Sequence, residues 1–340
     1  DVNIINNYIE KSKRLININI ILNNNKEKEM KEIIKSLGKI EIKKESLYKD
    51  FNIQYREPVH KLNYHKDYIT SLTILNDGRM ASGSADRTII IYNKILFTPD
   101  IIIKEHYNNK DINKYNNVAC LLQLSSGELI TSSQEIIILK INDLNYKVVQ
   151  RLKDNKNYVL EIIELKNGGF ASCSNDSSVI FYYKDNNSEY KINFRVTMGG
   201  GCYTLIQTKE NEICCSEGNN NSICFYDFVE KKIKSSMIVS KICRGNSKFL
   251  MISKDLLLVP GENKISIINV NEYKLVRIIE VPETSWILGV CKLSEDMIIT
   301  GSYSKTIHQW KIEKDNLILI SKKEKVHNNN ISILYNLRNG

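Results

Sequence analysis

The residues best suited to chemistry are a histidine, a serine and an aspartate that stand close together, His65, Ser82 and Asp86. A relay of these three types can activate a hydroxyl nucleophile, because the histidine takes the serine proton and the carboxylate orients the imidazole. The rest of the chain does not support catalysis, since it has no G-x-S-x-G, H-E-x-x-H or phosphate-loop motif. Buried polar groups need partners in any tightly packed unit. We therefore expect a structural trio and not an enzyme.

A glycine-rich stretch and the cysteines could also do chemistry. Met198-Gly-Gly-Gly201 could approach a phosphate, but no Lys-Ser/Thr and no helix pattern follows it, so a tight loop is expected. The chain has 8 cysteines without a C-x-x-C pair, which argues against zinc or redox sites. They are Cys120, Cys173, Cys202, Cys214, Cys215, Cys224, Cys243 and Cys291. Several fall at apolar strand positions, which favours buried free thiols, a reducing compartment and no metal or cofactor.

Charge and hydropathy bound the choice of partner. Lys+Arg total 48 and Asp+Glu 39, a net charge of +9, but acids and bases are interleaved, as in Glu27-Lys28-Glu29. This pattern favours a solvated surface over a continuous phosphate track, although basic loops such as Lys322–Lys325 keep RNA binding as an alternative. No run approaches the ~18 apolar residues of a membrane helix. The unpaired cysteine pattern favours an intracellular protein, cytoplasmic or nuclear, and no targeting signal is visible in the first residues.

An internal repeat organises most of the chain. Leu75–Tyr92 contains a tight Asn-Asp-Gly turn, a short apolar strand, an aspartate and a second apolar strand, and this frame recurs. The turn markers are Gly78, Gly127, Gly168, Asn211, Asp255, Asp296 and Gly340. Successive markers lie 41 to 49 residues apart, close to the roughly 40–45 residues of a four-stranded propeller blade. β-branched and aromatic runs between turn residues indicate short antiparallel strands. The sequence predicts an all-β propeller over 56–340.

These units resemble the WD-repeat family, in which a His, a second-strand Ser or Thr, a turn Asp and a Trp form one hydrogen-bonded network per blade. His65 and His327 each lie 13 residues before a turn marker, and Asp86 and Asp176 match the turn aspartate. The Trp column reads Tyr92, Ile141, Tyr182, Tyr226, Asn269 and Trp310, so the resemblance is to a divergent member. It implies a structural network that includes His65, Ser82, Asp86, Asp176, His327 and Trp310.

The repeat count predicts six whole blades over 65–325 and the inner strand of a seventh at Ile331–Leu337. We expect the parent protein to continue past Gly340 by at least ~20 residues to complete a seven-bladed ring. Val59–Tyr64 would then be the outer strand of the last blade. A six-bladed ring closed by Ile331–Leu337 is the alternative.

A separate segment, 1–55, precedes the repeats. Met30, Ile33, Leu37, Ile40, Lys44, Leu47 and Phe51 follow one another at steps of three and four, the spacing of a heptad seam. Residues 26–51 could therefore form a coiled coil that mediates self-association. A lone amphipathic helix or a linker is the alternative.

Partner binding is expected at the loops that lead into the inner strands. The residue ten before each turn marker gives the column Tyr68, Asn117, Tyr158, Gly201, Gly245, Trp286 and Asn330. Aromatic residues are typical anchors of interaction hot spots, so Tyr68, Tyr158 and Trp286 are the candidate contacts. Their expected neighbours are Asp67, Arg87, Arg244 and Tyr303. The alternative is that these rings pack on adjacent loops.

The function that these features favour is a non-catalytic scaffold for protein or peptide partners. In the WD-repeat family, a coiled coil before a propeller can accompany regulatory or ubiquitin-ligase subunits, so a substrate-recognition subunit is one alternative. A basic, RNA-binding propeller is another.

Overall fold

The computed structural model describes residues 62–107, 117–218, 221–239, 248–282, 285–326, 331 and 333–335. The predicted helical segment 1–55, with its seam over 26–51, lies outside these residues and stays a prediction, as do His327 and Arg244. Within the part of the chain that the structure describes, no helix has the length and apolar character needed to cross a membrane.

The described residues form six four-stranded antiparallel sheets, each a simple up-and-down meander. Blade one is β1 (Ile69–Ile74), β2 (Met80–Ser84), β3 (Ile89–Tyr92) and β4 (Pro99–Ile103), and blade two is β5 (Cys120–Gln123), β6 (Leu129–Ser132), β7 (Ile136–Ile141) and β8 (Tyr146–Leu152). Blade three is β9 (Val159–Glu164), β10 (Phe170–Ser174), β11 (Ser178–Lys184) and β12 (Tyr190–Thr197), and blade four is β13 (Leu205–Lys209), β14 (Glu212–Glu217), β15 (Ser222–Asp227) and β16 (Lys232–Ile238). Blade five is β17 (Leu250–Met251), β18 (Leu256–Pro260), β19 (Lys264–Asn269) and β20 (Lys274–Glu280), and blade six is β21 (Ile287–Ser294), β22 (Met297–Ser302), β23 (Ile307–Glu313) and β24 (Asn316–Lys323). The 3-10 helix η1 (Glu105–Tyr107) follows β4.

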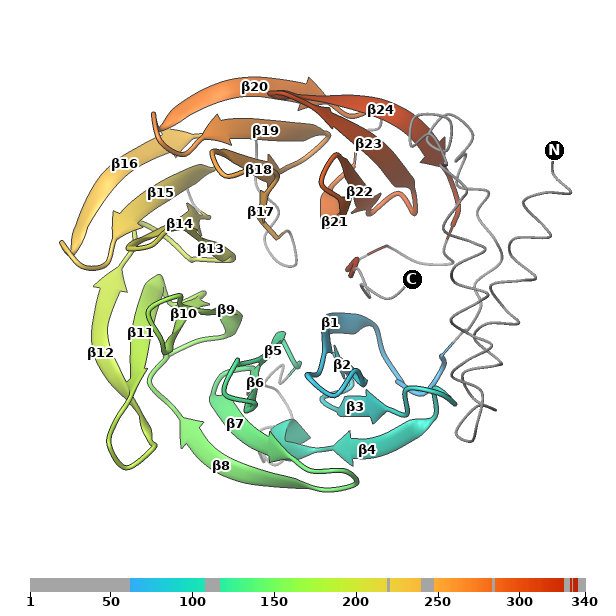
Figure 1. Ribbon diagram of the computed structural model, residues 1–340, viewed down its shortest axis with the longest axis vertical. Helices are drawn as coiled ribbons and strands as arrows, with labels where there is room; N and C mark the ends of the chain where they lie inside the picture. The colour runs from blue at the N-terminus through green and yellow to red at the C-terminus, as the bar shows by residue number, and fades with distance from the viewer. Residues whose placement is uncertain are drawn as a thin grey trace, which may run out of the picture. The chain divides into compact units, whose positions relative to one another are not determined.

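The blades follow one another around a common centre, with the first strand of each innermost (Figure 1). Because successive side chains of a strand point to opposite faces, a strand between two neighbouring blades is apolar on both faces. In β7, Ile136 and Ile138 pack toward blade three, whereas Ile137 and Leu139 pack toward blade one. Five such clusters, one between each pair of successive blades, make up the core. The all-β propeller predicted from the repeat is therefore confirmed.

A recurring backbone bond joins the entry to the inner strand of blades two, three, four and six to the blade before it. The NH of Val118 donates to the carbonyl of Ser84 at 3.1 Å, and Val159, Cys202 and Ile287 repeat this bond to Ser133, Ser174 and Gly261. Ile331 makes the same bond to Ser302 at 3.2 Å. The glycines repeat the relationship, since a Cβ on Gly83 would meet Val118 and Leu121, and one on Gly301 would meet Ile331 and Leu334. Ile331 thus packs on blade six in the same way that Val118, at the entry to blade two, packs on blade one.

The prediction of seven blades is nevertheless wrong for the structure described, which has six. A blade needs four paired strands, and residues 331 and 333–335 adopt no strand. The outer strand predicted at Val59–Tyr64 is also not seen in its described part, Leu62–Tyr64. Instead the Tyr64 ring packs against Tyr92 of blade one, with ring centroids 6.1 Å apart.

Candidate functional site

His65 sits between Asp86 and Ser82 in blade one. Its Nδ1 lies 2.9 Å from the Asp86 carboxylate and its Nε2 lies 2.7 Å from the Ser82 hydroxyl, which is 3.0 Å from the Tyr92 hydroxyl. Thr88 completes the group through bonds from its hydroxyl and its backbone NH to Asp86. The predicted trio is thus brought together, and it gains two members, Tyr92 in place of tryptophan and Thr88.

The burial of this network decides what it can do. The side chains of His65 and Asp86 are 4% and 9% exposed, and Ser82 is 2% exposed, so no substrate can reach the serine hydroxyl. Burial alone would raise the pKa of Asp86, but hydrogen bonds from Thr88, the Lys66 backbone and His65 lower it below its usual value. The carboxylate stays ionised and fully engaged inside the blade. The group therefore fastens the loop before β1 to the turn between β2 and β3, which favours the structural reading of the trio.

Blade three repeats this cap. One oxygen of Asp176 accepts the backbone NH of Lys156 at 2.6 Å, and the other accepts the NH of Ser178 at 2.9 Å and its hydroxyl at 2.5 Å. In blade one Asp86 bonds the equivalent Lys66 and Thr88 groups. The hydrogen bonds lower the pKa of Asp176 although burial acts in the opposite direction. The two aspartates recognised from the sequence thus hold the same turn in the same way.

A β-bulge marks the tryptophan column in every blade. The pairing of the third and fourth strands shifts register at one place in each blade, immediately before Tyr92, Leu139, Tyr182, Tyr226, Ile268 and Trp310. All six of these side chains are buried. Two positions of the sequence column, Ile141 and Asn269, were therefore wrong. The column was counted from turn markers, whereas the bulge falls two residues earlier in blade two and one residue earlier in blade five.

His106 is a network histidine that the repeat spacing missed. It lies in η1, is 4% exposed, and its Nε2 is 3.0 Å from the Thr131 hydroxyl. Thr131 occupies the place in blade two that Ser82 occupies in blade one, because each lies two residues beyond the partner of the bulge residue. Burial lowers the pKa of His106 to about 4, with help from the charge of Arg151. The signal available in the sequence was the 49-residue interval between Gly78 and Gly127, the longest of the set, which indicates an insertion beside this histidine.

The candidate binding surface is formed by the residues directly before the inner strands together with the turns between the second and third strands; we call it the rim. One backbone bond builds it in four blades. The carbonyls of Tyr68, Tyr158, Gly201 and Trp286 accept the NH groups of Ala85, Asn175, Gly218 and Tyr303, respectively, at 2.9 to 3.0 Å. These four residues of the predicted column therefore occupy equivalent positions in the backbone of their blades. The other three are Asn117, which is described, and Gly245 and Asn330, which are not.

The rim exposes aromatic rings to different degrees. Tyr68 is 53% exposed and Tyr303 57% exposed, whereas Tyr158 and Trp286 are half-buried. Asn117 donates to the Tyr68 hydroxyl at 3.1 Å and so connects blades two and one. Asp67 accepts the backbone NH of Tyr68 at 2.8 Å. Arg87 stands in the next turn at a positive φ of 69°, held by its NH bond to Ser84.

Tyr203 is a fourth ring at the inner-strand positions that the sequence column did not contain. Its ring lies against Gly201 and Gly218, so closely that a Cβ on Gly218 would come within 1.7 Å of the ring. The sequence column has Gly201 in blade four and therefore predicts no aromatic residue there. The ring of Tyr203, two residues after Gly201, fills the space that the two glycines leave free.

A carboxylate on the inner strand of blade three links three blades. Glu161 of β9 accepts hydrogen bonds from the hydroxyl of Thr204 and, at 3.1 Å, from the NH of Leu205. Its other oxygen lies 3.4 Å from the Lys248 ammonium. The Lys248 side chain is partly exposed; desolvation would lower its pKa, but the charge of Glu161 raises it above its usual value, so the lysine stays cationic. Among the described residues, no cluster of three His, Cys, Asp or Glu side chains is arranged to hold a metal ion.

Comparisons with known proteins agree with this geometry. The family model "WD domain, G-beta repeat" matches residues 56–93, the span that contains His65, Ser82, Asp86 and Tyr92. No curated protein sequence matches the chain.

Among solved structures, the one described as "Structure of U3-55K" is similar with a TM-score of 0.64 at 16% identity, covering 80% of this chain and 86% of that one. "Crystal structure of RRP9 WD40 repeats" is similar with the same score, identity and coverage of this chain, and 84% of its own chain is covered. At this identity the likeness establishes the fold.

Proposed function

We propose that this chain, which belongs to the WD-repeat β-propellers, is a non-catalytic scaffold whose rim binds a protein or peptide partner. The observation that supports the proposal is the set of aromatic rings at residues joined by the repeated backbone bond, Tyr68, Tyr158, Trp286 and Tyr303, together with Tyr203, whose ring lies against Gly201 and Gly218. Tyrosine and tryptophan combine a large contact area with a polar group, and they dominate the binding energy of protein interfaces.

The charge distribution supports a protein partner over nucleic acid. Two cations on this side of the molecule are paired with acids: Lys248 with Glu161, and Arg151 with Glu135 at 2.7 Å and with Glu105. Phosphate recognition needs several cations without competing carboxylates. An electrophoretic shift with a single-stranded RNA at two salt concentrations would separate the readings, because binding that weakens steeply with salt would favour RNA.

The proposal also covers the assembly in which the propeller would work and its cellular location. Within a larger regulatory assembly of the ubiquitin-ligase type, such a rim would serve as the substrate-recognition surface, and this is the alternative we carry. The seven described cysteines, all buried and free, favour an intracellular setting, cytoplasmic or nuclear.

The experiment is a comparison of partner capture by two folded double variants. Tyr158→Ala with Trp286→Ala removes two rim rings from blades three and six. Ile95→Ala with Leu144→Ala removes two side chains that are 76% and 67% exposed in the turns between the third and fourth strands, on the opposite face. We expect the rim variant to lose the proteins that the wild type captures, and the control to retain them. Unchanged capture by the rim variant would place the binding surface elsewhere.

A further inference from the structure

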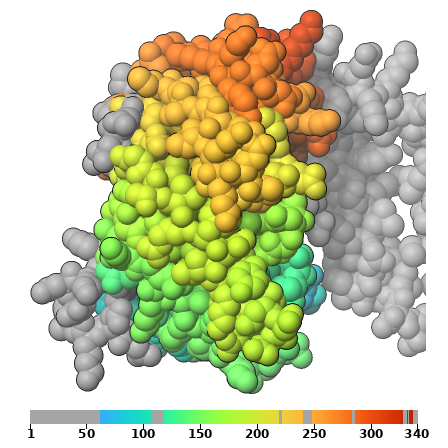
Figure 2. Space-filling model, turned by 90° about the vertical axis from the view of Figure 1, so that its left-hand side faces the viewer, coloured from blue at the N-terminus to red at the C-terminus, as the bar shows by residue number. Residues whose placement is uncertain are grey.

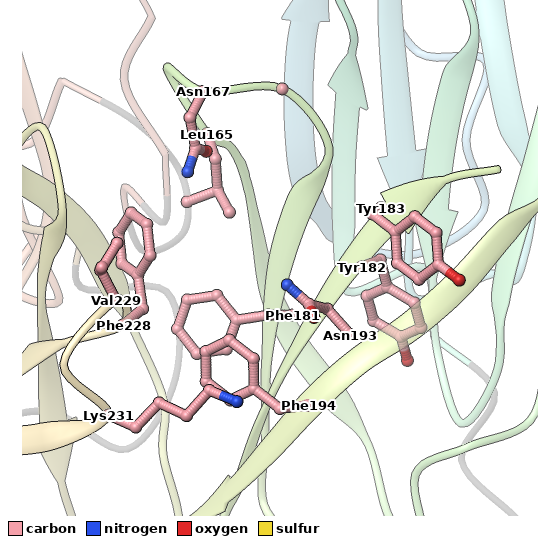
Figure 3. Close-up of a pocket in the computed structure, with 11 residues that line it drawn as sticks. Leu165, Asn167, Phe181, Tyr182, Tyr183, Asn193, Phe194, Phe228, Val229 and Lys231 are labelled. Atoms are coloured by element: carbon pink, nitrogen blue, oxygen red, sulfur yellow. The ribbon is translucent and has the colours of Figure 1, made fainter.

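A recess of about 310 Å³ opens between the outer part of blade three and the turn that joins β15 to β16 in blade four. It lies where the first strand of blade three ends and the turn after the third strand of blade four begins, on the face opposite the rim. Figure 2 shows the wall that these two blades form. Its lining includes Leu165, Phe181, Phe194, Phe228, Val229 and Lys231 (Figure 3).

The floor of the recess is aromatic. Phe181 and Phe194 stack with their ring centroids 4.3 Å apart, and Phe228 lies 5.4 Å from Phe181. Phe181 and Phe228 are buried, whereas Val229 at the mouth is 60% exposed. Ligand pockets start at a volume of roughly 300 Å³, so this recess suits one large apolar side chain.

The mouth carries a cation that the turn itself does not neutralise. The Lys231 ammonium lies 5.1 Å from the centroid of the Phe194 ring, alongside the ring in Figure 3. The two acids of the turn are engaged elsewhere, because Glu230 pairs with Lys232 at 2.6 Å and with Lys234 at 2.7 Å, and Asp227 pairs with Lys234. Among the residues described, Lys231 has no carboxylate partner of its own. The other polar side chains that line the recess are uncharged: the amides of Asn167 and Asn193 and the tyrosines Tyr182 and Tyr183.

We infer that this recess docks a short acidic segment of a partner protein, with an aromatic or large aliphatic side chain on the phenylalanine floor and a neighbouring carboxylate on Lys231. The positive charge beside an apolar floor is complementary to this combination and repels a basic segment. The recess lies on the face opposite the rim, so this inference does not depend on the partner proposed for the rim.

A direct binding measurement tests the inference. The probe is a fluorescein-labelled heptapeptide with a central Phe between Asp and Glu, flanked by Gly and Ser, and its affinity is read by fluorescence anisotropy. One matched probe replaces Phe with Ala, and the other replaces the acids with Asn and Gln. We expect the loss of Phe to weaken binding at least about tenfold, because burial of the ring removes a large apolar surface from water. Neutralising the acids should weaken it about two- to fivefold, and added salt should reduce that difference.

Variants of the protein locate the site. Lys231→Gln should weaken binding of the acidic probe about two- to fivefold and leave the neutral probe unchanged. Val229→Glu places a carboxylate beside Lys231 at an exposed position and should abolish binding. Lys232→Gln, at a neighbouring lysine already paired with Glu230, and Trp286→Ala, on the rim, should bind as the wild type does. The inference is overturned if the acidic probe does not bind, if it binds no better than the neutral probe, or if Val229→Glu binds normally. A failure here leaves the rim proposal intact, because the rim variants are assayed separately.

Discussion

The indole nitrogen of Trp310 donates a hydrogen bond of 3.0 Å to the hydroxyl of Thr300, and both side chains are almost completely buried. Ser82 and Tyr92 form the equivalent pair in blade one, also 3.0 Å apart. In blade five both positions are apolar, with Val259 and Ile268 fully buried. Loss of one partner of a buried hydrogen bond strands the other, whereas replacement of both is nearly neutral. In blade five the two positions are therefore replaced together, whereas in blade two Leu139 stands with Thr131, whose hydroxyl bonds His106 instead.

The substitution Thr300→Val tests this relationship. Valine keeps the shape of threonine but leaves the indole NH of Trp310 without its acceptor, so we expect a loss of about 1–3 kcal/mol in the free energy of unfolding. Urea denaturation measures it. The matched control is Val259→Thr, which buries a hydroxyl among apolar groups in blade five and should also destabilise the protein. A Thr300→Val protein as stable as the wild type would mean that the bond contributes nothing.

The repeat period predicted the propeller because strand runs and turns depend on local residue types. The network residues of blade one were found for the same reason, since their spacing follows the turn. The tryptophan column was wrong in blades two and five because the bulge that defines it depends on cross-strand pairing, which turn counting does not see. His106 was hidden by an insertion, and Tyr203 by two glycines that shift an aromatic ring by two residues. Such features depend on contacts between segments distant in sequence.

The number of blades depends on contacts of the same kind. Ile331 repeats the backbone bond of an inner strand, which is what the apolar pattern at Ile331–Leu337 suggested. A blade forms only when three more strands pair alongside the inner strand. The apolar pattern of one segment does not show whether such strands are present. The recess at Lys231 also escaped sequence reasoning, because its lining comes from two blades.

His106 should make stability depend on pH. Its folded pKa of about 4 lies below the unfolded value, so the folded protein holds this histidine neutral. The contribution is fully present above the unfolded pKa of ~6.5 and is lost as the pH falls from there toward the folded value. Between about pH 7 and pH 5 the loss should be about 2 kcal/mol.

The variant His106→Gln isolates this effect, because glutamine can still bond Thr131 but does not titrate. We expect it to be less stable than the wild type at neutral pH and to lose less stability on acidification. Thermal unfolding of both proteins across this pH range measures the difference. Parallel stability curves would show that His106 is not the group responsible.

Glu161 should contribute more through its hydrogen bonds than through its charge. Glu161→Gln retains an acceptor for Thr204 and Leu205 and should cost about 1 kcal/mol, since Lys248 is partly exposed and its ion pair is screened. Glu161→Leu strands a buried hydroxyl and a backbone NH, and should cost about 3 kcal/mol or more. Lys248→Met is the comparison, expected to cost less than about 1 kcal/mol. Equal losses for Glu161→Leu and Lys248→Met would instead make the ion pair the main contribution.

Gly218→Ala should displace Tyr203 from the rim. The new methyl group would lie 1.7 Å from the ring, so the ring must move, at a cost of about 1–3 kcal/mol. Removing the ring should relieve the clash, so Gly218→Ala with Tyr203→Ala should be about as stable as Tyr203→Ala alone. Urea denaturation of the three variants measures this rescue. If Tyr203 is a partner contact, Gly218→Ala will also weaken partner capture in the folded protein. A double variant less stable than both single variants would mean that the glycine is required by the backbone and not by the ring.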